Sequence, residues 1–354
     1  MITTSKDNDW YSTNKPIFEK LAFKVQSILI DILEENKIEY HIVSSRCKTI
    51  ESFTKKIENP KYNNRQQLTD LAGIRIITYV EDSIPLISKI IHDNFNVDDE
   101  NSLDKADDLG LDKVGYKSVH FVAQLPDSRI ALTEYKRFKN LKFEIQVRTI
   151  LQHSWAEIEH DRNYKFAGNL PSKIQRRFKL LAGLLELADN EFNSISREID
   201  QYSKEVKDKT IKGDLEISVN STSLKEFLSQ KFSDITESTI SQTLHDGKQI
   251  IEELEDFGIK TLKELDEIIP TDLKQKYKDF NIHTSFTGIV RDIMIINDYE
   301  KYFQSVYRGD WWFETSGDDF LILKKYNLKI HEIEKVVFQE DQIRALQEFN
   351  EEED

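Results

Sequence analysis

The stretch KFEIQVRT, residues 142–149, constrains the fold of this chain more than any other segment. Its residues alternate between polar and apolar, which is the pattern of a β-strand with one buried face. The other face then carries Glu144, Gln146 and Arg148 in one row, because side chains two residues apart point the same way. Burying an acid, an amide and a guanidinium without partners costs several kcal/mol. The row therefore predicts a polar cleft lined by this strand.

The same patterns divide the chain into an α/β part and a mainly helical part. In the first part we expect strands at 39–44, 72–80, 117–125 and 141–149, and helices at 17–36, 48–57, 85–95 and 151–207, the last broken near 168–171. In the second part we expect helices at 224–232, 235–244, 247–257, 261–268 and 290–305, and a strand at 319–326. The polar stretch at 207–214 predicts the boundary between domains at 1–210 and 214–354.

Composition limits the location and the partners of the protein. A single cysteine, Cys47, excludes an intramolecular disulfide and a cysteine-based zinc site, and it predicts a reducing, cytoplasmic location. No apolar run is long enough to predict a membrane span, and the first residues do not form a signal peptide. The formal net charge of −15 opposes general nucleic-acid binding. Residues 46–75 nevertheless hold seven basic and three acidic residues, which predicts a local basic pocket.

Part of this positive charge surrounds the start of a predicted helix. Arg46 and Lys48 precede the helix, and Ser52 and Lys56 lie one turn apart on it. Free amides and the helix dipole favour anions at such a terminus. The segment by itself leaves two interpretations open, a polyphosphate site and a solvated amphipathic helix.

Two acids are candidates for a metal site. Asp70 precedes the strand at 72–80, and Arg75 lies within that strand. A carboxylate at a strand edge near cations commonly holds Mg²⁺ beside phosphates, although an ion pair between Asp70 and Arg75 is the alternative that this segment alone favours. Together with the polar row, the pattern predicts that Asp70 and Glu144 bind one Mg²⁺, with Arg75 and Arg148 near phosphate oxygens.

The segment GYKSVHF, residues 115–121, supplies a further pair of candidates. Tyr116 opens the strand, where its ring could stack on a base. His120 shares a face with Ser118, opposite the apolar residues of the strand. A lone strand histidine is more often structural, but the position of His120 beside the polar row favours a functional role.

Five motifs occur in a recognisable order: SRCKTIESFTKK, LTDLAGIRI, GYKSVHF, FEIQVRT and WAEIEHDRNYK. In order and approximate spacing they resemble the synthetase domain of RelA/SpoT-type alarmone synthetases, and especially the small, single-activity members. The resemblance covers about residues 17–207. It implies a mixed five-stranded sheet flanked by helices and related to nucleotidyltransferases. It also implies Mg-dependent transfer of the pyrophosphate of ATP to the 3′-hydroxyl of GDP or GTP, which gives (p)ppGpp and AMP.

The resemblance assigns roles to individual residues. The expected ligands of ATP and its phosphates are Arg46, Lys48, Ser52, Lys56, Arg75 and Arg148. Asp70 and Glu144 are expected to hold Mg²⁺, and Glu144 is a candidate acceptor of the 3′-hydroxyl proton. The expected acceptor-nucleotide residues are Tyr116, which would stack on guanine, with Lys117, His120, Gln146 and Asn163. The chain departs from the family pattern at Ser45, where the family usually has glycine.

Three functions remain open at this point. The first is a (p)ppGpp synthetase whose second domain regulates, oligomerises or localises it, and a protein partner of that domain is a further expectation. The second is a toxic relative that pyrophosphorylates the 3′ end of tRNA and carries a neutralising or sensing second domain. The third is a binding module on an inactive synthetase fold, which the retained acids and cations disfavour. We expect ATP and GDP or GTP as ligands, no membrane association, and a homo-oligomer.

Overall fold

The computed structural model describes residues 2–60, 62, 64–104, 118–165, 171–235, 240–280, 282–309, 319–329, 331–333 and 335–337. The chain forms two compact units, Met1–Arg197 and Glu198–Asp354. Each unit has its own hydrophobic core, and the two core clusters share no residue. Helix α7 (Ser172–Ile211) continues through this division and ends within the polar stretch at 207–214.

A mixed sheet forms the centre of the first unit. Five strands run in the order β1-β2-β6-β5-β3, and a two-residue strand, β4, also pairs with β5. The strands are β1 (Ile42–Cys47), β2 (Ala72–Thr78), β3 (Asn96–Val97), β4 (Leu103–Asp104), β5 (Val119–Gln124) and β6 (Phe143–Thr149). Only the pair β2–β6 is parallel among these strands. The predicted mixed five-stranded sheet and the antiparallel neighbours β5 and β6 are confirmed, whereas the short β3 and β4 were not expected.

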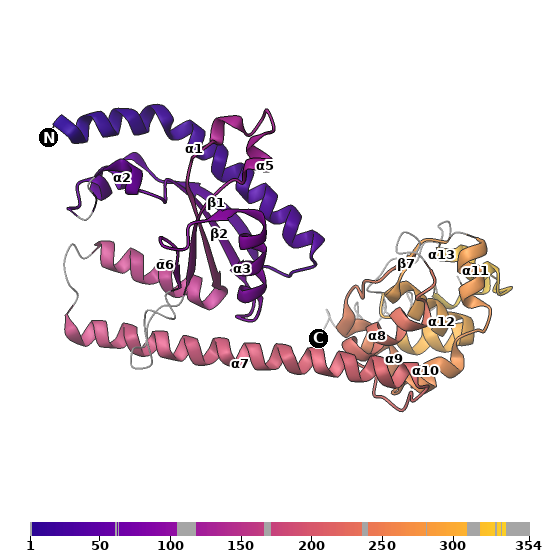
Figure 1. Ribbon diagram of the computed structural model, residues 1–354. Coiled ribbons are helices and arrows are strands. Elements are labelled where there is room, and N and C mark those ends of the chain that lie inside the picture. The colour runs from indigo at the N-terminus through magenta and orange to yellow at the C-terminus, as the bar shows by residue number, and fades with distance from the viewer. Residues whose placement is uncertain are drawn as a thin grey trace, which may run out of the picture. The chain divides into compact units, whose positions relative to one another are not determined.

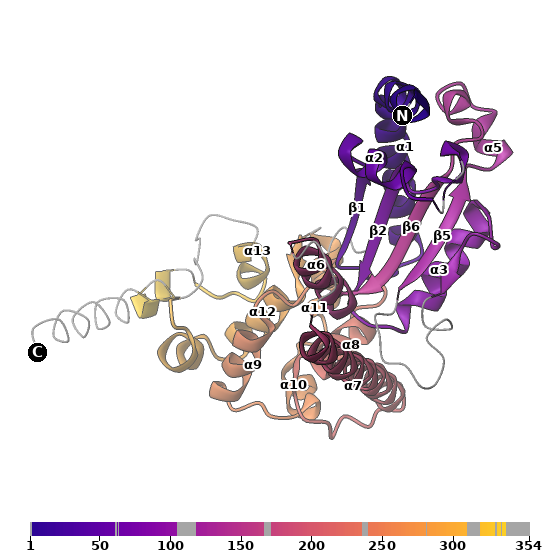
Figure 2. The same ribbon diagram turned by 90° about the vertical axis from the view of Figure 1, so that its left-hand side faces the viewer.

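Helices cover the two faces of this sheet unequally. Helices α1 (Ile2–Glu35) and α3 (Ser83–Asn94) pack on one face, and α6 (Ile150–Lys165) lies on the other (Figures 1 and 2). The face under α1 and α3 is the core, and its central strand residues are Ala72, Ile74, Ile76, Phe143, Ile145 and Val147, all fully buried. The apolar row of the 142–149 segment is therefore buried as predicted, and its polar row faces the α6 side.

The remaining helical segments of the first unit are short. They are α2 (Ile50–Ile57), η1 (Arg65–Gln67), α5 (Asp127–Ile130) and η2 (Lys136–Phe138). The side chain of Thr49 caps α2 by accepting a hydrogen bond from the amide of Ser52. Pro85 lies in the first turn of α3, where a missing N–H costs nothing. Helix α1 begins well before the expected start at residue 17, because Tyr11 is fully buried in the core.

The second unit is mainly helical, as predicted. Its elements after α7 are α8 (Ser221–Lys231), β7 (Ile240–Ser241), α9 (Gly247–Asp256), α10 (Leu262–Ile268), α11 (Leu273–Asp279), β8 (Thr284–Ser285), α12 (Phe286–Lys301), the π-helical turn η3 (Tyr302–Val306) and α13 (Asp319–Lys324). Helix α12 forms much of the core, where Ile289, Val290 and Ile293 are fully buried. The core also contains an ion pair, in which Arg291 Nη2 lies 2.6 Å from Glu253 Oε1.

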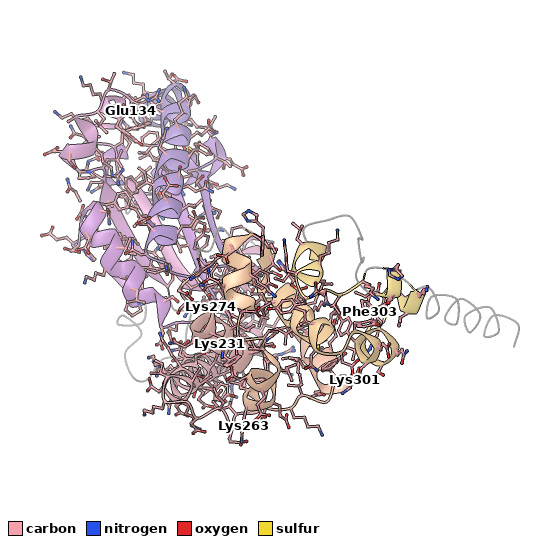
Figure 3. The ribbon with its side chains drawn as sticks, turned by 90° about the vertical axis from the view of Figure 1, so that its right-hand side faces the viewer. Glu134, Lys231, Lys263, Lys274, Lys301 and Phe303 are labelled. Atoms are coloured by element: carbon pink, nitrogen blue, oxygen red, sulfur yellow. The ribbon has the colours of Figure 1, made fainter. Side chains whose placement is uncertain are left out.

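The surface of the second unit carries lysines paired with acids. Lys263 Nζ lies 2.6 Å from Glu216 Oε1, and Lys231 pairs with Asp266 (Figure 3 labels both lysines). These pairs are partly exposed to solvent, so they contribute little to stability. None of the helices that the structure describes combines the length and apolar character needed to cross a membrane.

Two expectations for the second unit were wrong. The segment 319–326 was expected as a strand, but Asp319–Lys324 forms α13. The adjacent residues Ile322 and Leu323 of this helix are both buried, which helical packing allows and an alternating strand does not. The segment 235–244 was expected as a helix, but Ile240 and Ser241 form β7, paired in parallel with β8. Periodicity cannot distinguish a helix from a strand in a short apolar run, so tertiary packing determined the structure of both segments.

Candidate active site

A cross-strand row on the polar face joins β1, β2 and β6. Strand pairing places Arg46 beside Gly73 and Gly73 beside Glu144. A Cβ atom at Gly73 would lie 3.6 Å from Cγ of Arg46, so the arginine side chain lies over β2 at the glycine. Desolvation, followed by repulsion from Arg75, lowers the pKa of Arg46. Bound negative charge at this position would offset the repulsion between the two arginines.

The next row along the sheet consists of Arg75, Gln146 and His120. Arg75 Nη1 lies 2.8 Å from Oε1 of Glu157, which reaches the sheet from α6. Gln146 donates from Nε2 to Glu144 Oε1 at 2.6 Å, and its own Oε1 accepts a hydrogen bond from Arg148. The polar row of β6 is therefore linked by hydrogen bonds along its length, which offset part of the cost of burying it.

Glu144 is the most strongly perturbed acid of this face. Its Oε1 lies 3.0 Å from Nδ1 of His120, and both side chains are largely buried. Burial raises the pKa of Glu144, but the hydrogen bond and charge of His120, the hydrogen bond from Gln146 and the charge of Lys56 outweigh burial and lower it to about 2. Glu144 is therefore ionised at neutral pH. The second ring nitrogen of His120, Nε2, is buried and has no hydrogen-bond partner.

The carboxylate of Asp70, just before β2, forms ion pairs with two lysines. Lys48 Nζ and Lys56 Nζ lie 2.7 and 2.8 Å from its Oδ2. Its other oxygen, Oδ1, is buried and has no hydrogen-bond partner. Because the charge of Lys56 also lowers the pKa of Glu144, this lysine is an electrostatic neighbour of both carboxylates. The two acids thus share one cationic environment on the same side of the sheet.

The residues of this face fit a magnesium ion. Ionised carboxylates are the hard oxygen ligands that Mg²⁺ prefers, and Asp70 Oδ1 is a buried oxygen that lacks a donor. Among the described residues, no group of three or more His, Cys, Asp and Glu side chains could hold a metal ion. A Mg²⁺ ion bound at this face would therefore take most of its ligands from water or phosphate, as Mg²⁺ usually does.

The position of Lys48 depends on helix α1. The Tyr11 hydroxyl donates to the backbone oxygen of Lys48 at 2.7 Å, and it lies 3.3 Å from Cys47 Sγ. The Tyr11 ring stacks on Phe53 of α2, with ring centroids 4.3 Å apart. One buried side chain thus holds the end of β1 and the helix that carries Lys56 together.

The structure brings several of the predicted site residues together. Lys48, Lys56 and Asp70 form one group, and Glu144, Gln146, Arg148 and His120 form a second, linked group. The hydroxyl of Ser52 accepts a hydrogen bond from Thr49 at the start of α2. Tyr116 and Lys117 lie outside the described residues, and the side chain of Asn163 does too.

Three residues of the site were missed or given no role from the sequence. Gly73 leaves the space that Arg46 occupies, Glu157 binds Arg75, and Tyr11 anchors Lys48. The position of Gly73 inside a β-branched run was a usable signal, since glycine in a strand often marks a close approach. No local signal connects Tyr11 or Glu157 with partners that lie far away in the sequence.

Residues 45–169 match the family model described as "Region found in RelA / SpoT proteins". The matched segment lies within the first unit and contains the whole polar face described above. The chain is 28% identical over 187 residues to the GTP pyrophosphokinase YjbM of Bacillus subtilis, covering 52% of this chain and 85% of the relative. It is 29% identical over 180 residues to YwaC of the same organism, covering 47% and 77%.

Solved structures are also similar to about half of this chain. The crystal structure of small alarmone synthetase 1 from Bacillus subtilis has a TM-score of 0.47 at 24% identity, covering 55% of this chain and 99% of that one. A GTP pyrophosphokinase family protein from Streptococcus pneumoniae has a TM-score of 0.46 at 23% identity, covering 55% and 96%.

Proposed function

We propose that this chain transfers the pyrophosphoryl group of ATP to the 3′-hydroxyl of GDP or GTP, producing AMP and ppGpp or pppGpp. Its similarity to two GTP pyrophosphokinases supports this reaction class. The observation that carries the proposal is the single polar sheet face, on which Asp70 and Glu144 share a cationic environment. Transfer of a phosphoryl-type group needs alignment and charge stabilisation more than covalent help from the protein, and this face offers both.

Four cations are available for the phosphates of ATP. Lys48 and Lys56 contact Asp70, Arg75 contacts Glu157, and Arg46 lies over Gly73. A bound polyphosphate competes for these cations because it carries more negative charge than a single carboxylate. Arg46 and Arg75 repel each other, so the triphosphate would stabilise both.

Magnesium is part of the proposal. Asp70 and Glu144 would hold it, and when bound it would neutralise charge on the phosphate oxygens. The lysines on Asp70 Oδ2 would then be available to contact phosphate oxygens.

The acceptor hydroxyl must lose a proton as its oxygen attacks the β-phosphorus and the bond from that phosphorus to the bridging oxygen of AMP breaks. A carboxylate with a pKa of about 2 is a weak proton acceptor, so Glu144 is better suited to orient its neighbour. His120 donates from Nδ1 to Glu144, so Nε2 is the ring nitrogen that is left to accept a proton. We therefore propose that His120 Nε2 accepts the proton that the acceptor hydroxyl loses.

The test supplies purified protein with ATP labelled in its β- and γ-phosphates, Mg²⁺, and one acceptor at a time, namely GDP, GTP or bulk tRNA. The proposal expects label on the guanosine nucleotides, and label found solely on tRNA would refute it. Replacing Glu144 by Gln keeps the size of the side chain but removes its charge, and should lower transfer by about 100-fold or more. Glu134, an exposed acid labelled in Figure 3, is the control, and Glu134→Gln should keep full activity.

A further inference from the structure

The first unit contains a cavity of about 540 Å³ that the transfer reaction does not use. It is lined by residues at the start of α3, at the start of β5, in the first turn of α6 and in the middle of α7. Among the described residues that line it, none was assigned above to magnesium, to ATP or to the proton. Its volume is within the usual range for small-molecule sites, so we asked which ligand its walls would recognise.

Contacts between α3 and α7 fix the walls of this cavity. Asn193 donates from Nδ2 to Asp82 Oδ1 at 2.8 Å, and its own oxygen accepts from the amide of Asp82 at 3.0 Å. Arg197 donates to both carboxylate oxygens of Asp82. The cavity is therefore formed before a ligand enters, which lowers the entropic cost of binding.

The buried end of the cavity presents uncharged polar groups. Ser118 is only 2% exposed, and its hydroxyl has no hydrogen-bond partner among the described residues. An unpaired buried hydroxyl costs about 1–3 kcal/mol, which a ligand that bonds to it would recover. Gln152 is also buried, and its Oε1 accepts from the amide of Thr149 at 3.1 Å. The group that Gln152 can offer to a ligand is therefore the donor Nε2.

The charges around the cavity disfavour an anionic ligand. Two acids, Glu81 and Asp82, line it against one base, Arg197, which leaves one negative charge in excess. The guanidinium of Arg197 is already engaged by Asp82. A phosphate group would meet charge of its own sign here, so the walls favour an uncharged molecule.

The remaining lining residues favour an adenine ring. Ile84, Pro85 and Val119 supply the apolar part of the wall, and Asn190 supplies a carboxamide on the exposed side. A carboxamide can bond to N6 and N7 of adenine at once, whereas guanine is recognised mostly by arginine or lysine. Because Arg197 is engaged by Asp82, the lining matches adenine better than guanine.

We propose that this cavity binds the adenine base of an uncharged nucleoside, adenosine. The carboxamide of Asn190 bonds to the N6 and N7 edge of the base. Gln152 Nε2 and the Ser118 hydroxyl bond to polar atoms of the ligand at the buried end, and the ring packs on Pro85 and Val119. This site is independent of the transfer reaction proposed above, because the two share no residue.

The first test titrates the full chain with adenosine by calorimetry, with and without a saturating non-hydrolysable ATP analogue and Mg²⁺. We expect one adenosine per chain in both conditions. Ser194, an exposed residue of α7, lines the cavity, and Ser194→Trp should lower the affinity by about 100-fold or more because the indole fills the space. Glu191 is exposed on the same helix outside the lining, so Glu191→Trp is the matched control and should leave the affinity unchanged.

The second test examines single contacts and charge. Ser118→Ala should weaken adenosine binding about fivefold, the value of one hydrogen bond. Because 7-deazaadenosine lacks N7, it should bind wild type about fivefold more weakly than adenosine, and the two should bind Asn190→Ala equally. AMP should bind about tenfold more weakly than adenosine, and Glu81→Gln should narrow that difference.

A chain that does not bind adenosine at millimolar concentration would overturn the proposal. Displacement of adenosine by the ATP analogue would place the ligand in the site for ATP and would refute a separate site. The same conclusion follows if Ser194→Trp, shown to be folded by circular dichroism, binds adenosine as wild type does. Tighter binding of guanosine than of adenosine would contradict the assignment of the base.

Discussion

At the scale of single residues, the site depends on Glu144 and the groups that hold its charge. The carboxylate is largely buried, and burial by itself would favour the neutral acid. Hydrogen bonds from His120 and Gln146, with Lys56 nearby, reverse that preference. The same three contacts that prepare the acid for a metal ion therefore also stabilise the folded chain.

This charge makes a pH-dependent contribution to stability. The folded-state pKa of Glu144, about 2, lies below its ordinary value of 4.5, so the unfolded chain binds the proton more readily. The contribution is complete above pH 4.5 and is lost as the pH falls toward 2. In metal-free buffer, the difference in unfolding free energy between wild type and Glu144→Gln should shrink by about 2 kcal/mol between pH 5 and 3. Urea unfolding at both pH values measures it, and a difference independent of pH would contradict the assigned pKa shift.

At the scale of elements, β2 and α1 position the cations of the site. Strand β2 lies between β1 and β6 and carries Arg75. Gly73, on the same strand, has no side chain and so leaves room on the polar face. Helix α1 reaches the site through Tyr11, which supports Lys48. Gly73 acts through the space beside Arg46 and Tyr11 acts through a hydrogen bond, so conservative substitutions can test each without changing a charge.

Substitution of Gly73 should act through Arg46. In Gly73→Ala the new Cβ makes an ordinary contact 3.6 Å from Arg46 Cγ, so the KM for ATP should stay within about twofold of wild type. In Gly73→Val the branched side chain fills the space over which Arg46 lies, and the KM for ATP should rise about tenfold. Steady-state kinetics measure both. Equal KM values for the two variants would show that Arg46 does not need this space.

Removal of the Tyr11 hydroxyl should loosen the end of β1. Tyr11→Phe keeps the stacked ring but leaves the Lys48 carbonyl oxygen without this donor, at a cost of about 1 kcal/mol. We expect a lower unfolding midpoint of the first unit and a fall of about threefold in kcat/KM, because Lys48 loses its support. Tyr79 is 51% exposed, so Tyr79→Phe is the control and should change neither quantity. Stability lost with kcat/KM intact would separate Tyr11 from the site.

At the scale of the whole molecule, the chain consists of two cores joined by one continuous helix. The core of the second unit contains the ion pair between Arg291 and Glu253, to which the Tyr302 hydroxyl donates at 2.9 Å. Only about 5% of the Glu253 side chain is exposed, so its charge depends on these partners. This unit can therefore be destabilised by a change that does not touch the first unit.

Arg291→Ala should lower the stability of the second unit by about 3 kcal/mol or more, because it leaves a buried carboxylate without its cation. Calorimetry should show a lower transition for that unit, while the transition of the first unit and the transfer activity stay unchanged. Arg308, whose ion pairs with Glu252 and Asp256 are half exposed, is the control, and Arg308→Ala should shift neither transition measurably. A common shift of both transitions would show that the units unfold as one.

Much of the candidate site could be predicted because its signals are local. The alternation in residues 142–149 determined which side chains of β6 share a face, and the motif order predicted the resemblance to the RelA/SpoT family, whose model matches residues 45–169. The cations before and within α2 were likewise visible in the sequence. The misassigned segment at 319–326 shows the limit, because a short apolar run fits a helix and a strand equally well.

By itself the sequence determined the kind of residue on each face, because periodicity follows from the geometry of a single strand or helix. The tertiary structure decided which residues meet. The parallel register of β2 and β6 places Glu144 beside Gly73, and burial of Tyr11 extends α1 toward the N-terminus. Such contacts join residues far apart in the chain, and their free energy depends on packing that no local pattern contains.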